Sequence, residues 1–232
     1  TEKIDSAMET NGPIPLADAF LINKNFKEAL EKTFWPGRTH CIKGEGYTLY
    51  LDGAHTPKSS SACSAWFRKK AGEEKQSLSG HSVARVLIFN CTGEWVPSEL
   101  LKPLVSCDFD AAVFCTNFVK GESGRKSSDL YSAALREDSI LKRRDENSQA
   151  WQQLELDRTL RSNPIQLCVS TLSDALHCVL VKREPSLRGP EHQHLPCFPL
   201  HSDHDYMQVL VTGSLHLVGD AMKVLGKNIE NV

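Results

Sequence analysis

The sequence predicts an α/β fold in which helices cover both faces of a mostly parallel sheet. Two observations carry this prediction. Short apolar runs of strand length alternate along the chain with segments whose apolar residues recur at helical spacing. Turn residues and helix start signals follow several of these runs, which is the order found in strand–helix–strand units. Alternation of this kind favours parallel strands that are buried on both faces.

The first strand is expected over residues 47–51, an apolar run that ends at a turn carrying Asp52 and His55. Thr56 is a suitable N-cap for the next helix, and Pro57 suits its first position because the missing N–H is not needed there. That helix is expected over residues 59–70, with an apolar face formed by Ala62, Cys63, Trp66 and Phe67.

Further strands and helices are expected along the rest of the chain. The strands cover residues 83–89, 111–115, 165–169 and 209–211, and the helices cover residues 26–33, 97–104 and 172–181. A last helix is expected after Ser214, which can cap it, and Gly226 lies where such a helix would close. These elements in this order indicate a Rossmann-like sheet.

Three segments have less regular patterns. Residues 1–33 are polar and linker-like apart from the short helix. The run Lys142-Arg143-Arg144 lies in a charge-dense stretch, and we interpret it as a solvated helix face rather than a binding patch. Residues 184–206 are interpreted as a mobile surface loop, with metal ligation as the alternative, because they hold four of the nine histidines: His192, His194, His201 and His204.

Composition narrows the class of protein. Of its residues, 40% are hydrophobic and 24% charged, which is typical of a globular protein. A length of 232 residues is sufficient for the hydrophobic core of one domain with extensions. A net charge of −2 favours neither nucleic acid nor an anionic membrane as partner. No apolar run has the length of a membrane span, and the first residues do not resemble a signal peptide. The eight cysteines are widely spaced, so we expect free thiols in an intracellular protein.

The chemically informative residues follow the predicted strands. Asp52 and His55 follow the first, residues 90–93 and 115–117 follow the next two, and residues 212–216 follow the last. In a parallel sheet these positions meet at the carboxyl edge, where ligands bind between diverging loops and helix N-termini. We therefore expect a ligand-binding edge.

Each candidate at this edge has a functional and a structural interpretation. Arg38, held in a Trp-Pro-Gly turn, suits a phosphate or carboxylate, or is a plain surface arginine. Asp52 can accept hydrogen bonds from ribose hydroxyls or an amine, or cap its own turn. His55 can donate to an anionic ligand or pack locally, and His216 is a weaker candidate of the same kind. Ser214 can help to hold a carboxylate at the helix N-terminus, although capping alone explains it equally well.

The sequence contains no complete catalytic motif. GxxxxGK[ST], G-x-S-x-G and zinc-ligand spacings are all absent from it. No catalytic residue and no metal ligand is therefore assigned.

Five sequence blocks resemble the folylpolyglutamate synthases of the vertebrate type, which are Mur-ligase-like ATP-dependent amide ligases. The blocks are Trp35-Pro-Gly-Arg38, Tyr50-Leu-Asp-Gly-Ala-His55, Val86-Leu-Ile-Phe-Asn-Cys-Thr-Gly93, Phe109-Asp-Ala-Ala-Val-Phe-Cys115 and Val209-Leu-Val-Thr-Gly-Ser-Leu-His-Leu-Val-Gly219. The resemblance implies the C-terminal domain type of the Mur ligases. It also implies that residues 1–34 are a linker and the end of an N-terminal ATPase domain, that residues 35–232 are the C-terminal domain, and that residues 120–205 contain a variable insertion.

The family joins L-glutamate to the γ-carboxyl of tetrahydrofolates through an acyl phosphate, using ATP and Mg²⁺. The resemblance implies that Arg38 and Asp52 contact the nucleotide and that His55 and Ser214 contact glutamate. It places the P-loop and the Mg²⁺ ligands in the N-terminal ATPase domain, so this chain alone is expected to be inactive. A monomer in the cytoplasm, the mitochondrion or both is implied.

A second interpretation remains open, in which the chain is a truncated or diverged binding domain of the same fold without catalysis. Two departures from the family pattern motivate it. Glu94-Trp95-Val96-Pro97 replaces an acidic–Arg–Asp–Pro stretch, and Asp220 replaces a glycine.

Overall fold

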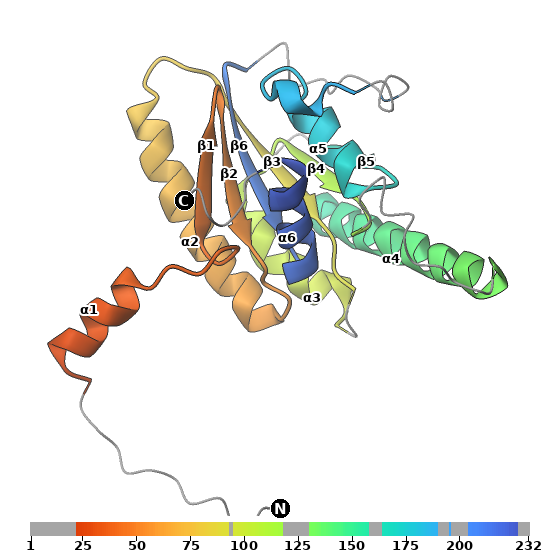
Figure 1. The fold of residues 1–232 in the computed structure, drawn as a ribbon, viewed down its shortest axis with the longest axis horizontal. Coiled ribbons are helices and arrows are strands. Elements are labelled where there is room, and N and C mark those ends of the chain that lie inside the picture. The colour runs from red at the N-terminus through yellow and green to blue at the C-terminus, as the bar shows by residue number, and fades with distance from the viewer. Residues whose placement is uncertain are drawn as a thin grey trace, which may run out of the picture. The chain divides into compact units, whose positions relative to one another are not determined.

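The structure describes residues 22–92, 95–117, 130–157, 164–189, 195 and 204–226, and the described residues from Trp35 onward are built around a six-stranded sheet (Figure 1). The structure is a computed structural model. The chain divides into two compact units, Thr1–Phe34 and Trp35–Val232. In the smaller unit, α1 (Lys24–Lys32) begins where the side chain of Asn23 accepts a 2.8 Å hydrogen bond from the N–H of Phe26.

The sheet of the larger unit has the strand order β1-β2-β6-β3-β4-β5. Its strands are β1 (His40–Gly44), β2 (Tyr47–Asp52), β3 (Val83–Phe89), β4 (Ala111–Phe114), β5 (Ile165–Cys168) and β6 (Tyr206–Thr212). All neighbouring pairs are parallel except β1 and β2, which form an antiparallel hairpin. The predicted mostly parallel α/β sheet is confirmed, and it gains an antiparallel edge strand.

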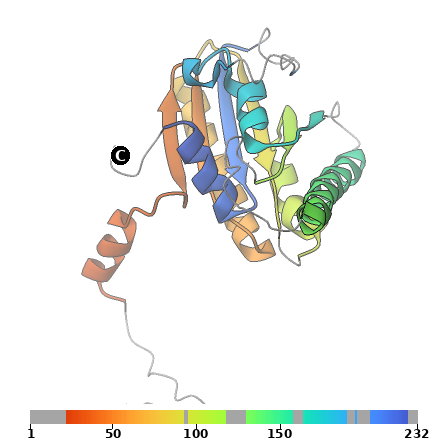
Figure 2. The same cartoon turned by 45° about the vertical axis from the view of Figure 1, so that its right-hand side comes forward.

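Helices cover both faces of this sheet (Figure 2). Their bounds are α2 (Pro57–Ser77), α3 (Pro97–Leu101), η2 (Lys102–Cys107), α4 (Leu130–Leu156), α5 (Leu172–Leu180), η3 (Pro185–Leu187) and α6 (Leu215–Val224). Alternate side chains of each strand face opposite sides. Val86 and Ile88 of β3 therefore pack with α5 and α6, whereas Leu87 and Phe89 pack with α2, α3 and α4.

Most predicted elements are present with shifted ends. Thr56 caps α2 through a reciprocal pair of hydrogen bonds with Ser59, as the sequence indicated for the N-cap, but the helix runs on to Ser77. Ala62 is exposed, so its place on the apolar face was wrong, while Cys63 and Phe67 are buried. The helix expected over 97–104 changes to a 3-10 helix at Lys102, next to a proline that cannot donate to a helical hydrogen bond.

The interpretation of Lys142-Arg143-Arg144 as a solvated face is wrong for both arginines. The Arg143 side chain is 22% exposed and that of Arg144 is 15% exposed. The reason is that α4 packs on the sheet through the fully buried Trp151, and both guanidinium groups donate to backbone carbonyls: Arg143 to Cys91 and Trp95, and Arg144 to Val169.

Several expectations concern residues outside the described part. The linker-like residues 1–21 lie there, as do His192, His194 and His201. His204 is described, and its backbone carbonyl accepts a hydrogen bond from Arg183. Among the described helices, none is long and apolar enough to cross a membrane. The seven described cysteines, all except Cys197, are free.

Candidate functional site

The carboxyl ends of four parallel strands meet at one edge of the sheet. Asp52 of β2 and Phe89 of β3 both lie opposite Thr212 of β6, and Phe89 also lies opposite Phe114 of β4. The register therefore brings the segments 52–56, 90–92, 115–117 and 213–216 to a common edge. This is the convergence that the sequence predicted.

Two helices begin at this edge and leave it on opposite faces of the sheet. After β2 the chain enters α2 on one face, and after β6 it enters α6 on the other. Ser214 caps α6, and its Oγ accepts a 3.2 Å hydrogen bond from the N–H of His216. Because neighbouring strands send their helices to opposite faces, a crevice opens between the two loops.

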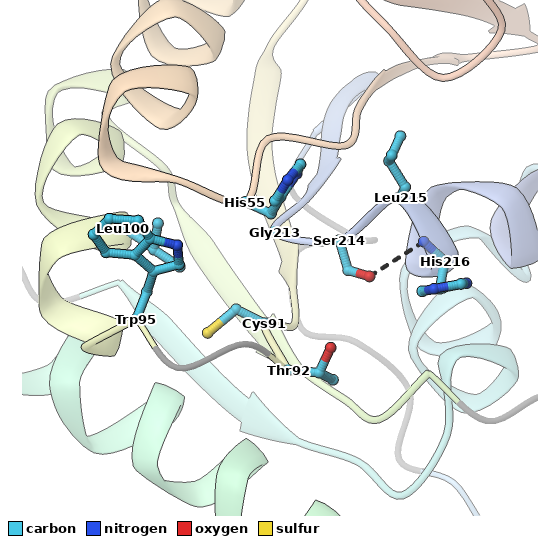
Figure 3. Close-up of a pocket in the computed structure, with 9 residues that line it drawn as sticks. All are labelled: His55, Cys91, Thr92, Trp95, Leu100, Gly213, Ser214, Leu215 and His216. Atoms are coloured by element: carbon cyan, nitrogen blue, oxygen red, sulfur yellow. Dashed lines mark hydrogen bonds between the residues drawn. The ribbon is translucent and has the colours of Figure 1, made fainter. Parts of the chain in front are cut away.

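A cavity of about 380 Å³ occupies this crevice (Figure 3). Its lining residues are His55, Cys91, Thr92, Trp95, Leu100, Gly213, Ser214, Leu215 and His216. They come from the turn after β2, the loop after β3, the end of α3 and the start of α6. One wall is apolar, with Trp95 and Leu100, and the opposite wall carries hydroxyl and imidazole groups. The cavity therefore suits a small ligand with a polar end.

Two glycines permit the close approach of these loops. Gly213 has a φ of +104°, and a Cβ there would lie 2.4 Å from the carbonyl oxygen of Asn90. At Gly53 a Cβ would lie 2.3 Å from the Leu215 side chain. Gly213 therefore requires glycine, because its φ is positive and the clash is with backbone, whereas a side chain at Gly53 would force the Leu215 side chain to move.

Arg38 and Asp52 form a pair of their own beside the cavity. The Trp35–Arg38 turn closes through a 3.0 Å hydrogen bond from the Arg38 N–H to the Trp35 carbonyl. The turn is tied to the end of β2 because the Gly53 N–H donates to the Gly37 carbonyl at 3.0 Å. Arg38 Nη1 lies 3.9 Å from Asp52 Oδ1, with the arginine side chain 35% exposed and the aspartate side chain 10% exposed.

Burial dominates the electrostatics of Asp52. It raises the pKa of this carboxyl above its ordinary value, while the Thr39 N–H, the Arg38 guanidinium and the Ala54 N–H oppose the rise. The Arg38–Asp52 contact is long and the arginine side chain is 35% exposed, so the guanidinium can turn toward an anionic ligand.

His55 and Ser214 both line the cavity. His55 Nδ1 donates to the Gly53 carbonyl at 2.9 Å, so a neutral ring offers Nε2 as an acceptor. Ser214 is 5% exposed, and its Oγ also receives a 3.5 Å hydrogen bond from Asn117 Nδ2. The structure thus groups the four predicted residues as two pairs, Arg38 with Asp52 and His55 with Ser214.

Sequence reasoning missed part of the cavity wall. Trp95, Leu100 and Leu215 were not proposed as site residues, and they line it. The signal that could have found two of them is exposure, since Trp95 and Leu215 are 45% and 44% exposed. The sequence alone does not show which large apolar side chains are exposed. Among the described residues, no three His, Cys, Asp or Glu side chains form a group that could hold a metal ion, so none of them is assigned to Mg²⁺.

A mostly parallel α/β sheet with a cavity between two helix starts at its carboxyl edge defines the class of protein, an α/β domain with a cavity at that edge of its sheet. No protein-family model matches the chain. Its sequence is 35% identical to human folylpolyglutamate synthase, mitochondrial, over 91% of this chain and 41% of that protein. It is 30% identical to a putative folylpolyglutamate synthase of Caenorhabditis elegans, over 86% of this chain and 35% of that protein.

The chain is therefore similar in sequence to the C-terminal part of folylpolyglutamate synthases. It spans about two fifths of the length of the curated relatives that it matches first. Among solved structures, Escherichia coli FolC in complex with DHPP and ADP superposes with a TM-score of 0.51 and 11% identity, covering 89% of this chain and 35% of that one. That likeness supports the fold.

Proposed function

We propose that this chain is the glutamate- and nucleotide-contacting part of a folylpolyglutamate synthase, an ATP-dependent ligase that joins L-glutamate to the γ-carboxyl of a reduced folate. One observation carries the proposal. The segment that is 35% identical to the human enzyme places an arginine–aspartate pair beside a cavity that contains a histidine and a capping serine, all at one edge of the sheet.

Arg38 and Asp52 are the proposed nucleotide contacts. A guanidinium that is only loosely held by its carboxylate can reach a phosphate and offset the charge that develops as the γ-phosphoryl group is transferred. Asp52 can accept hydrogen bonds from ribose hydroxyls or keep the arginine oriented. The structure of E. coli FolC contains ADP, which agrees with nucleotide binding by proteins of similar fold.

His55 and Ser214 are the proposed glutamate contacts. The N-terminus of α6 favours a carboxylate, and Ser214 lies at that N-terminus on the cavity wall. The Nε2 of His55 can accept a hydrogen bond from the glutamate amine, which must attack the activated carboxyl as a free amine. Together these contacts would hold glutamate by both of its α-substituents.

The remaining parts of the reaction are proposed to come from an N-terminal ATPase domain of the same protein. The sequence has no GxxxxGK[ST] motif to surround the β- and γ-phosphates, and the Mg²⁺ that supports phosphoryl transfer is placed in that domain. We propose that the isolated chain does not turn over ATP. Because three relatives are named mitochondrial, a mitochondrial location is proposed, with a cytoplasmic form alongside.

The test joins this chain to the N-terminal part of the human relative and follows glutamate incorporation into a tetrahydrofolate. Arg38→Ala should abolish most of the activity, whereas Arg68→Ala, at an exposed position of α2, should leave it unchanged. A folded fusion without activity would contradict the ligase proposal and support the alternative of a diverged, non-catalytic binding domain.

A further inference from the structure

We propose that Arg143 of α4 is a positioning residue that holds Cys91 and Trp95, two described residues of the loop between β3 and α3, at the wall of the cavity. Its importance for glutamate binding rests on the proposed function, but the structural role stands on contacts alone. The loop supplies Cys91, Thr92 and Trp95 to the cavity lining. Arg143 itself lies outside the lining and acts on the loop from behind.

Arg143 contacts two described residues of this loop, Cys91 and Trp95. Nε donates to the carbonyl of Cys91 at 3.3 Å, and Nη2 donates to the carbonyl of Trp95 at 2.5 Å. Nη2 also lies 3.7 Å from the Cys91 sulfur, and Nη1 forms a 3.2 Å ion pair with Glu146. One planar guanidinium thus joins two carbonyls that are four residues apart, which a single ammonium group cannot do in the same way.

The next turn of α4 extends the contact toward Ser214. Asn147 lies four residues after Arg143, on the same helix face, and its Oδ1 accepts a 3.0 Å hydrogen bond from the Cys91 thiol. Its Nδ2 donates to Asn90 Oδ1 at 3.3 Å. Asn90 in turn donates to Asn117 at 2.7 Å, and Asn117 donates to Ser214 Oγ at 3.5 Å.

This arrangement connects α4 with both sides of the cavity. Asn90, Cys91 and Asn147 are at most 2% exposed, so the polar groups of these three residues need hydrogen-bond partners within the protein. Removing Arg143 leaves the Cys91 carbonyl without that donor, and the loop end is then expected to move. A shifted loop would displace Trp95 and misplace the ligand that the cavity holds.

The thiol of Cys91 reports on the loop without any assumption about function. The test measures the iodoacetamide alkylation rate of each cysteine in the 232-residue chain by peptide mass spectrometry. Arg143→Ala should speed alkylation of Cys91 about tenfold, because the exposure of a buried thiol by local opening outweighs the loss of a guanidinium that lowers the pKa of that thiol. Cys63 and Cys115 are buried under other elements and should stay protected, which verifies that the variant is folded.

Arg144→Ala is the matched control. Arg144 is the neighbouring residue on α4, and it also donates to a backbone carbonyl, that of Val169 at 3.2 Å, away from the cavity lining. Cys91 should react in this variant as it does in the wild type. The proposal is wrong if Cys91 stays protected in Arg143→Ala, or if both variants expose it equally. If Arg143→Ala does not fold, Arg143→Lys is tested in its place. The alkylation rate of Cys91 in that variant should lie between the wild-type rate and the tenfold higher rate expected for Arg143→Ala.

A second measurement separates this proposal from the proposed function. In the fusion with the N-terminal part of the human relative, Arg143→Ala should raise the KM for glutamate about fivefold to tenfold, with a smaller change in kcat, and Arg144→Ala should change neither. If Arg143→Ala exposes Cys91 in a fusion that has no ligase activity, the positioning role of Arg143 is supported and the proposed ligase function is contradicted. If the fusion is active and Arg143→Ala leaves the KM for glutamate unchanged, the proposed effect of Arg143 on glutamate binding is wrong.

Discussion

The backbone N–H of Thr39 donates a 2.9 Å hydrogen bond to Oδ2 of Asp52, across the hairpin that joins the Trp35–Arg38 turn to β2. Thr39 adopts a φ of +45°, unusual for a β-branched residue, in order to point its N–H at that carboxylate. The carboxylate thereby fixes the turn from which Arg38 projects. Asp52 acts on the position of Arg38 twice, through this hydrogen bond and through the 3.9 Å ion pair.

Asp52 should make stability depend on pH in the direction opposite to an ordinary surface carboxylate. Burial raises its pKa in the folded state, so the folded chain binds a proton more tightly than the unfolded chain does. Relative to Asp52→Asn, the wild type should therefore lose stability as the pH rises from below the ordinary value of 3.8 through the raised pKa. Urea unfolding of both proteins across this range measures the difference, and a difference that grows in favour of the wild type with pH would contradict it.

Gly213 should tolerate no side chain. A Cβ would meet the Asn90 carbonyl at 2.4 Å, and the φ of +104° is strained for alanine, so Gly213→Ala should lower the free energy of unfolding by about 1–3 kcal/mol or more. Gly219 lies inside α6, and a Cβ added there would have no neighbouring atom within 4 Å, so Gly219→Ala should raise stability by up to about 1 kcal/mol. Chemical unfolding of the two variants provides the comparison, and equal effects would contradict the argument.

The sequence predicted the parallel strands and helix starts well because local patterns determine them. Apolar runs marked β2, β3 and β4, and the Thr56 and Ser214 caps are read directly from residue type. The strand β1 was missed because only its first residue, His40, is buried, and its place depends on pairing with β2. An edge strand of this kind leaves a weak apolar signal.

The gathering of site segments at one edge was also predictable, since parallel strands place their carboxyl ends together. The division of the four site residues into the pairs Arg38–Asp52 and His55–Ser214 was not predictable, because it depends on which loops contact one another. The same holds for Arg143, whose partner Cys91 is 52 residues away in sequence. A run of basic residues shows charge, but it does not show that backbone carbonyls after β3 and β5 lie within reach.

Ser214 should combine a structural role with a functional one, and a second cap can separate them. Ser214→Ala and Thr56→Ala each remove an N-cap side chain, so each should cost about 0.5–2 kcal/mol of stability. Only Ser214 lines the cavity. In the fusion protein, Ser214→Ala should therefore raise the KM for glutamate, whereas Thr56→Ala should leave it unchanged. If the two variants have equal KM values for glutamate, Ser214 acts only as the N-cap of α6 and does not contact glutamate.

His55 should contribute to glutamate binding more than to the chemical step. Its ring is oriented by the 2.9 Å bond from Nδ1 to the Gly53 carbonyl, so the imidazole is already held at the cavity before a ligand enters. Loss of one such contact to a charged or polar ligand costs about 1.4 kcal/mol, equivalent to a tenfold rise in KM. Steady-state kinetics of the fusion carrying His55→Ala should show that rise with kcat changed less.

The control for this prediction is His81→Ala, at an exposed histidine beyond the end of α2 and outside the cavity lining. It should leave both kinetic constants as in the wild type. His55→Gln tests the chemistry of the contact, because the amide oxygen of glutamine can accept a hydrogen bond from an amine as Nε2 does. Partial recovery of the KM in this variant is expected. If His55→Gln binds glutamate no better than His55→Ala, a hydrogen bond accepted at this position is not what holds the amine, and the contact must be assigned to another residue of the cavity.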